Sequence, residues 1–142
     1  MADCVFCMIR DAKIPSAKVY DDERTLAFMD INPLTPGHCL VVTKAHAATL
    51  YDAEVEDLKA AVATAKKVAG ALRKVLNPDG LNVLQANGAA AFQSVPHFHL
   101  HLIPRWTNDG KGFDWTPVPG PREQIMKIGE KLRAVLGGHD HD

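Results

Sequence analysis

Three histidines alternate with apolar residues in the segment HFHLHLI, which occupies positions 97–103. Side chains of a β-strand point alternately to opposite faces, so His97, His99 and His101 would share one face while the apolar residues between them face a core. Each imidazole can donate or accept a proton near neutral pH, act as a nucleophile or bind a metal. The segment therefore predicts a strand that carries a functional site on one face.

The bulk properties fit one domain with a hydrophobic core. The chain has 142 residues, of which 46% are hydrophobic, and a net charge of -1 gives no general attraction to nucleic acid or acidic membranes. No apolar run is long enough to span a membrane, the first residues do not resemble a secretory signal, and the three cysteines are an odd number. We expect a cytoplasmic protein without nucleic-acid or membrane partners, forming a single domain over residues 1–142. Its core would span about residues 4–105, with a C-terminal extension at 106–142.

Periodicity predicts two main helices. Apolar residues recur every three or four positions from about Asp52 to Leu76, where Asp52 is expected to cap the helix. A last helix from about Arg122 to Leu136 is expected to bury one apolar stripe, consisting of Ile125, Ile128, Leu132 and Val135. A short helix is predicted near residues 5–12.

Short β-rich segments separate these helices. They lie at 18–20, 25–29, 38–42, 81–85 and 98–103, and Pro104 is expected to end the last one because proline lacks a ladder donor. Short strands flanking one long helix favour an α+β domain with an antiparallel sheet.

The histidine segment resembles the signature of the histidine triad (HIT) family, His-x-His-x-His followed by two apolar residues, in which each x is apolar. Other segments match the family in the same order, namely 14–17 (IPSA), 26–33 (LAFMDINP), 35–38 (TPGH), 87–88 (NG) and 93–95 (QSV). The resemblance covers about residues 4–105. It implies a five-stranded antiparallel sheet with one long helix and a C-terminal helix, and a homodimer that joins two such sheets into one.

The resemblance also implies an activity. Family members bind a nucleoside phosphate and transfer or hydrolyse it at the α-phosphorus, with the middle histidine, here His99, as the nucleophile. The backbone carbonyl of His97 would hold the other ring nitrogen of His99 as a donor. His101, helped by Ser94, would protonate the leaving group, and general acid catalysis of this kind contributes about 10²- to 10⁴-fold.

The remaining site residues follow from the matched positions. Asp30 would accept hydrogen bonds from the ribose, and His38 is either a nucleotide contact or a buried core histidine. The other expected nucleotide-binding residues are Phe6, Ile9, Phe28 and Ile31 around the base, and Asn87, Gln93 and Val95 near the phosphate. Plainer roles remain open, because Asp30 could be a turn acid, Ser94 a loop hydroxyl and the apolar residues only core. The sequence has no carboxylate pair or Walker-type lysine for magnesium, so we expect metal-free phosphoryl chemistry.

One position departs from the family pattern. A glycine often precedes the Gln-Ser pair, and here that position holds Phe92. A residue with a β-carbon cannot adopt every backbone conformation open to glycine, which places the shape of the phosphate loop in question. Trp106 and Trp115 could either cover the nucleotide or hold the last helix.

A second site is indicated by Cys4 and Cys7, which form a CxxC pair. One branch of the family completes such a pair with the histidine after the central strand and the first histidine of the triad, here His46 and His97. The resemblance thus implies one structural zinc per chain, held by two cysteines and two histidines. A rival interpretation makes His97, His99 and His101 the ligands of a catalytic metal.

The leading interpretation is a nucleotide hydrolase or transferase that acts on purine nucleoside phosphoramidates or related adenylates through a nucleotidyl-histidine intermediate. One alternative is a diadenosine polyphosphate hydrolase, which would use the same His99 but release a different leaving group. Another is a nucleotide-binding regulatory module with little turnover.

Overall fold

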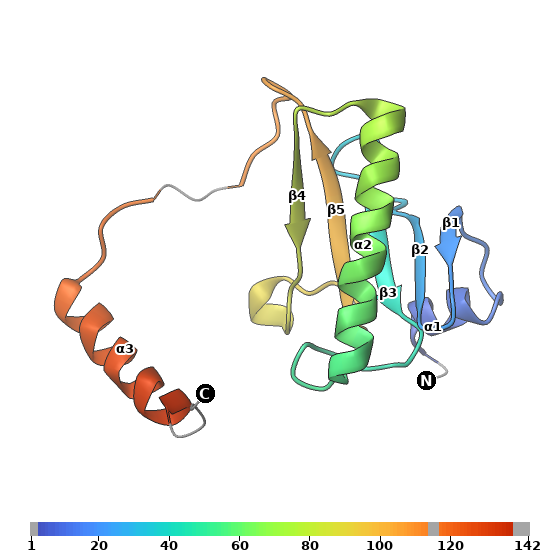
Figure 1. Cartoon of the computed structure of the whole chain (residues 1–142). Helices are drawn as coiled ribbons and strands as arrows, with labels where there is room; N and C mark the ends of the chain where they lie inside the picture. The colour runs from blue at the N-terminus through green and yellow to red at the C-terminus, as the bar shows by residue number, and fades with distance from the viewer. Residues whose placement is uncertain (1–2, 114–116, 138–142) are drawn as a thin grey trace. The chain divides into compact units, whose positions relative to one another are not determined.

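Five strands form one antiparallel sheet in the order β1-β2-β3-β5-β4 (Figure 1). The strands are β1 (Lys18–Asp21), β2 (Thr25–Met29), β3 (Cys39–Thr43), β4 (Gly80–Leu84) and β5 (His99–Arg105). The predicted α+β class and five-stranded antiparallel sheet are confirmed. Because β5 lies between β3 and β4, the histidine strand is central, and β1 and β4 are the two edges.

Two helices cover opposite faces of the sheet. Helix α2 (Val55–Leu76) packs on the face that carries Ala27, Val41, Phe98, Leu100 and Leu102. Helix α1 (Val5–Arg10) packs on the other face, which carries Leu26, Phe28, Leu40 and Val42. In Figure 1, α2 lies in front of the sheet and α1 behind it. The alternation along β5 thus directs its apolar side chains towards α2 and leaves its histidines on the α1 side.

The predicted start of the long helix is wrong by three residues. Helix α2 begins at Val55 after the N-cap Glu54, and the Asp52 carboxylate accepts instead from the backbone N–H and the hydroxyl of Thr49, at 3.2 and 2.9 Å. Asp52 therefore closes a turn before the helix. The helix ends where predicted, because Asn77 adopts the left-handed conformation and its N–H donates to the Arg73 carbonyl.

Pro104 does not end the histidine strand, which continues to Arg105. Strand β3 begins at Cys39, whose partner on β5 is Leu102, so from Ile103 onward β5 pairs with β4 alone. A proline is tolerated there because one side of the strand needs no donor. The Pro104 carbonyl also accepts a hydrogen bond from the Thr35 hydroxyl at 2.6 Å.

The structure, a computed structural model, describes residues 3–113 and 117–137. The chain divides into two compact units, Met1–Lys111 with the sheet and Gly112–Asp142 with helix α3 (Arg122–Gly137). The last helix is confirmed, but the burial of its apolar stripe is not, because Ile125, Ile128, Leu132 and Val135 are 49–70% exposed. The described part of the second unit contains no other helix or strand for that stripe to pack against. Trp115 lies outside the described residues.

Across the described residues, none of the helices is both long and apolar enough to cross a bilayer.

Candidate functional site

A cavity of about 310 Å³ opens on the α1 side of the sheet. Its lining includes most of the predicted nucleotide-binding and catalytic residues, namely Phe6, Ile9, Phe28, Asp30, Ile31, Ser94, Val95, His99 and His101. Helix α1 and strand β2 supply half of its apolar lining residues, and β5 supplies the two histidines. The structure thus brings an apolar surface and two imidazoles to one pocket, an arrangement typical of small-molecule sites.

His99 has a defined tautomer. Its Nδ1 lies 2.7 Å from the His97 carbonyl oxygen, which can only accept, so Nδ1 carries the proton. Burial lowers the pKa of His99, with the hydrogen bond to His97 and the charge of Asp30 acting in the opposite direction. The ring is therefore neutral near pH 7, and its Nε2 carries a lone pair.

His38 and His101 contact each other through their ring nitrogens, and hydrogen bonds also define the tautomers of these two rings. The Leu34 backbone N–H donates to His38 Nδ1 at 2.9 Å, so a neutral His38 carries its proton on Nε2. That Nε2 lies 3.0 Å from His101 Nδ1, which must then accept, leaving the His101 proton on its own Nε2. Burial lowers the pKa of both rings, that of His101 to about 4. His101 therefore presents an N–H donor on the nitrogen that does not contact His38.

Asp30 lies beside these rings. Its Oδ2 is 3.4 Å from His38 Nε2, while its Oδ1 accepts the backbone N–H of Asn32 at 2.8 Å. The second contact is the turn role that the sequence left open. Asp30 also lines the cavity, so the same carboxylate is available to a ligand there.

Three predicted site residues do not line the cavity. His38 lies behind His101, and the side chains of Asn87 and Gln93 brace the loop that follows β4. Gln93 accepts the Gly88 N–H at 2.7 Å and donates to the Ala48 carbonyl at 2.6 Å, and Asn87 accepts the Leu50 N–H at 2.7 Å. In this structure their amides fix the loop that carries Ser94.

Phe92 occupies the conformation that a glycine would favour. Its φ is 66° and its ψ is 31°, directly after a short 3₁₀ turn at Ala89–Ala91, and its side chain is 91% exposed. A residue with a β-carbon pays about 1–2 kcal/mol in this region. The loop thus has a glycine-like backbone despite the substitution.

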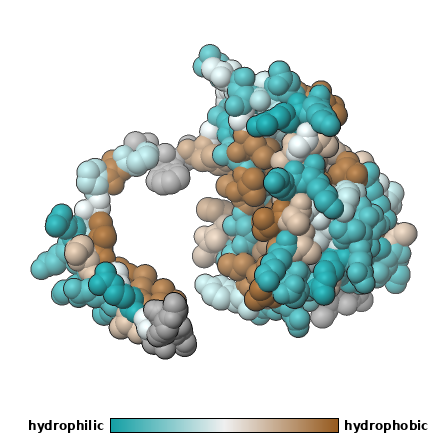
Figure 2. All heavy atoms as spheres, in the orientation of Figure 1, coloured by the Kyte–Doolittle hydropathy of each residue, from teal (hydrophilic) through white to brown (hydrophobic). Residues whose placement is uncertain are grey.

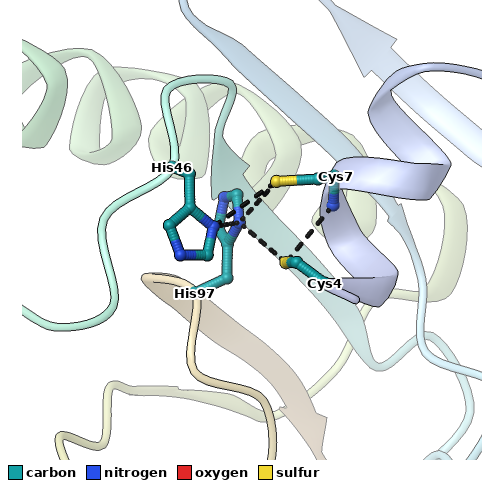
Figure 3. A group of neighbouring side chains, drawn as sticks. All are labelled: Cys4, Cys7, His46 and His97. Carbon is teal, nitrogen blue, oxygen red and sulfur yellow. Dashed lines mark hydrogen bonds between the residues drawn. The ribbon is translucent and has the colours of Figure 1, made fainter. Parts of the chain in front are cut away.

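The four residues of the predicted metal site meet beside this pocket (Figure 3). Cys4 and Cys7 come from the start of α1, His46 from the loop after β3 and His97 from the segment leading into β5. Nδ1 of His97 lies 3.3 Å from Cys4 Sγ, 3.7 Å from Cys7 Sγ and 3.2 Å from His46 Nδ1. A tetrahedral zinc with bonds of about 2.0–2.3 Å separates its ligands by roughly 3.3–3.8 Å. The observed spacings fit such an ion closely.

Protonation supports the same conclusion. His97 Nε2 lies 2.6 Å from the Thr43 carbonyl oxygen and therefore donates to it, so the Nδ1 lone pair faces the two sulfurs. Burial lowers the pKa of His97 to about 4, which keeps the ring neutral. Burial raises the pKa of the Cys7 thiol, so a cation is needed to hold it as a thiolate.

Two other metal sites are disfavoured. Asp30, His38 and His101 lie close enough to hold an ion, but His38 Nε2 carries the proton that its Nδ1 contact requires and offers no lone pair. The three-histidine site fails because His97 Nδ1 faces the cysteines while His99 Nδ1 donates to a carbonyl.

Several functional groups gave no signal in the sequence. The Thr43 carbonyl and the Leu34 N–H orient histidines, but any residue type supplies such backbone groups. Ile14, Pro15 and Leu40 also line the cavity and were missed, although they lie within or beside segments that match the family. Trp106 is not one of the described residues that line the cavity, and its backbone N–H donates to the Asp109 carboxylate.

Comparison with known proteins decides the family. The HIT domain matches residues 11–108, which is well over half of the chain. The chain belongs to the HIT domain family. A protein of Schizosaccharomyces pombe named adenosine 5'-monophosphoramidase is 38% identical over 134 residues, covering 94% of this chain and 98% of that protein.

Solved structures of the family agree with the fold. The crystal structure of a HIT family protein from Bacillus subtilis is 38% identical, with a TM-score of 0.85 and 99% coverage of both chains. The crystal structure of a zinc-bound histidine triad family protein from Mycobacterium smegmatis is 36% identical, with a TM-score of 0.75, covering 98% of this chain and 99% of that one.

Proposed function

We propose that this HIT protein hydrolyses purine nucleoside phosphoramidates, or related adenylates, through a nucleotide covalently bound to His99. The observation that carries the proposal is the Nε2 lone pair of His99, which is fixed by the bond from Nδ1 to the His97 carbonyl and borders the apolar cavity. A neutral imidazole attacks phosphorus without prior deprotonation and splits one difficult displacement into two easier ones. The relative in Schizosaccharomyces pombe named adenosine 5'-monophosphoramidase supports this substrate class.

The proposed reaction has two steps. His99 Nε2 forms a bond to the α-phosphorus while the bond between phosphorus and the leaving nitrogen breaks. The leaving nitrogen departs with a proton taken from solvent, and the Nε2–H of His101 donates a hydrogen bond to it while Ser94 helps to position it. In the second step water attacks phosphorus, its proton passes to solvent, and the bond to His99 breaks, which releases the nucleoside monophosphate and restores the lone pair on His99 Nε2.

The other residues that line the pocket suit the remaining parts of a nucleotide. The rings of Phe6 and Phe28 lie 5.4 Å apart in an edge-to-face arrangement and, with Ile9 and Ile31, offer an apolar surface to a purine. Asp30 would accept hydrogen bonds from the ribose hydroxyls.

Beside this pocket, we propose that Cys4, Cys7, His46 and His97 hold one zinc ion per chain. Four protein ligands leave no open position, so the ion would tie the start of the chain to the histidine strand rather than bind substrate. The ligand spacing and the zinc-bound relative in Mycobacterium smegmatis support this assignment.

Steady-state kinetics test the proposed substrate class. Adenosine 5'-phosphoramidate should be cleaved to AMP and ammonia with a kcat/KM well above that for a diadenosine polyphosphate. His99→Asn should abolish turnover while nucleotide binding persists. A preference for the diadenosine compound would favour the alternative hydrolase. Tight AMP binding without turnover of either compound would favour the regulatory module.

We also propose a homodimer. The edge strand β4 exposes Leu81, Val83 and Leu84, and α2 exposes Val55 and Val62. Figure 2 shows apolar surface gathered over this side of the first unit. An exposed apolar edge strand favours pairing with another strand, and two copies of β4 paired about a twofold axis would join the sheets.

A further inference from the structure

His97 belongs to two sites at once. Its ring faces the cysteines and His46, and its main-chain carbonyl accepts a hydrogen bond from Nδ1 of His99 at 2.7 Å. The proposed metal ligand and the acceptor that sets the tautomer of the proposed nucleophile are therefore parts of one residue. His97 is fully buried, so neither group has water as an alternative partner.

The peptide that carries the His97 carbonyl lies outside the paired part of the sheet. Strand β5 begins at His99, whose partner on β3 is Val42, so His97 precedes the paired residues. Its N–H donates to the Val95 carbonyl at 2.8 Å, which is a contact within the same loop. The N–H that shares a peptide unit with the His97 carbonyl belongs to Phe98 and donates to the Ala47 carbonyl at 2.7 Å, and Ala47 directly follows the proposed ligand His46. The orientation of the His97 carbonyl thus depends on this bond and on the His97 side chain, which is fixed by the Thr43 carbonyl on one nitrogen and by the metal group on the other.

A second contact runs from the metal group to His99. Phe6 lies between Cys4 and Cys7 on the short helix α1, and its ring meets the His99 ring edge-to-face at 5.0 Å and the His97 ring at 5.8 Å. A helix of six residues is not stable by itself, so the two cysteine ligands help to fix the position of this ring. The proposed nucleophile is held on two sides by the residues that surround the metal.

We propose that metal binding by this group sets the tautomer and orientation of His99, so that the metal is a positioning element for the reaction as well as a brace for the fold. This inference rests on the proposed function. Without the metal, the His97 ring and the loop of His46 and Ala47 are no longer tied together, so the His97 peptide can shift and the His99 Nδ1 proton can lose its acceptor. The alternative tautomer, protonated on Nε2, has no lone pair directed at phosphorus.

A spectroscopic experiment tests the inference without substrate. Protein labelled with ¹⁵N in its histidines would be compared by NMR with one equivalent of zinc and after removal of zinc by a chelator. The zinc-loaded protein should show the pattern of a single Nδ1-protonated ring for His99, assigned by its loss in His99→Asn. The chelated protein, still folded by circular dichroism, should show averaged tautomers, and added zinc should restore the first pattern.

A pair of variants separates positioning from stability. His97→Cys and His46→Cys each keep four ligands of types that zinc accepts, but only residue 97 supplies the carbonyl and the Thr43 contact. At equal zinc content, His97→Cys should have a kcat at least about tenfold below that of His46→Cys, with a smaller change in KM, as is typical when a group that orients a metal-site residue is altered. Val68→Ala, in the α2 core, measures the effect of lost stability alone.

The outcomes are distinct. Failure of zinc-loaded wild type to cleave adenosine 5'-phosphoramidate contradicts the proposed function but leaves the NMR test intact. An unchanged His99 tautomer in folded, zinc-free protein overturns the inference. So does an equal kcat for the two cysteine variants at full zinc content. If the chelated protein does not fold, the comparison of the two cysteine variants decides. If His97→Cys does not fold, the NMR comparison decides.

Discussion

At the scale of single residues, backbone groups determine which nitrogen of each histidine carries its proton. The His97 carbonyl accepts from Nδ1 of His99, so the His99 proton is on Nδ1. The Thr43 carbonyl accepts from Nε2 of His97, so the His97 proton is on Nε2. The Leu34 N–H donates to Nδ1 of His38, so the proton of the neutral His38 ring is on Nε2. In the proposed function, these three similar side chains take different roles: His99 is the nucleophile, His97 a metal ligand and His38 the partner of His101. Their chemistry follows from main-chain geometry.

The pH dependence of kcat/KM tests the protonation state of His99. Burial lowers its pKa below the ordinary 6.5, and the negative charge of Asp30 acts to raise it. Protonation of Nε2 removes the attacking lone pair, so activity should be flat near neutral pH and fall as the pH falls through the lowered pKa. Asp30→Asn removes the charge that favours the imidazolium, so its acid limb should move to lower pH, while KM rises by about tenfold or more from the lost ribose contact.

A charge control accompanies that profile. Asp57→Asn removes the same charge from α2, on the opposite face of the sheet, and should leave the profile in place. An acid limb that moves to higher pH in Asp30→Asn would contradict the assigned roles of Asp30 and His99.

Phe92 provides a test of backbone strain. Its left-handed conformation costs about 1–2 kcal/mol, and glycine removes that cost while adding about 0.5–1 kcal/mol of unfolded-state entropy. Phe92→Gly should therefore be as stable as wild type or more stable by up to about 1 kcal/mol in urea unfolding, although a large side chain is deleted. A loss above about 1 kcal/mol would show that the exposed ring makes a stabilising contact.

The sequence supports the site residues unevenly. His99 and His101 follow from the alternating pattern, and both line the cavity. The contacts of Asn87 and Gln93 were not predictable, because an amide serves a phosphate and a loop equally well. Thr43 could not be found at all, since its contribution is a carbonyl that every residue has.

At the scale of elements, helix α1 connects the two sites. One of its faces carries the cysteines, and another carries Phe6 and Ile9 in the wall of the cavity. The long helix has a different role, since α2 supports the sheet from the opposite face. Changes in α1 should therefore affect nucleotide and metal binding together, whereas changes in α2 should affect stability.

Gly37 shows how closely the elements pack. Its φ is +90°, and a β-carbon there would collide with Leu76 at the end of α2 and lie 3.1 Å from Pro104 of β5. Gly37→Ala should lower the free energy of unfolding by about 1–3 kcal/mol, because both the backbone and the space are unsuitable. In the matched control Gly70→Ala, the new β-carbon meets nothing within 4 Å on the exposed side of α2. That variant should gain about 0.5–1 kcal/mol. Equal effects of both variants in urea unfolding would contradict this packing.

The types of the helices and strands were predictable because the spacing of apolar residues indicates which side chains are buried. The alternation in β5 matches the observed cores, whereas α2 buries Ala65, Val68 and Leu72 of its apolar stripe and leaves Val55, Val62 and Val75 exposed. The predicted cap at Asp52 and strand end at Pro104 were wrong because tertiary context decided them. Thr49 engages Asp52, and the pairing of β5 with β3 does not extend to Pro104.

At the scale of the whole molecule, the proposed dimer accounts for the apolar edge at β4. Val83→Lys places a charge on that edge and should convert the protein to monomers in sedimentation experiments, since a buried unpaired charge is costly. Val19 on β1, the other edge of the sheet, is similarly exposed, at 48% against 52% for Val83. Val19→Lys should remain dimeric, and dissociation of this variant alone would place the interface at β1.

The most direct test of the account is trapping of the nucleotide on His99. Protein mixed with a radiolabelled adenylate donor and quenched in base should carry label that is stable in base and lost in acid, as expected for a phosphoramidate bond to histidine. His99→Ala should carry none, although its cavity still binds AMP. Equal labelling of wild type and His99→Ala would contradict the assignment of His99 as the nucleophile.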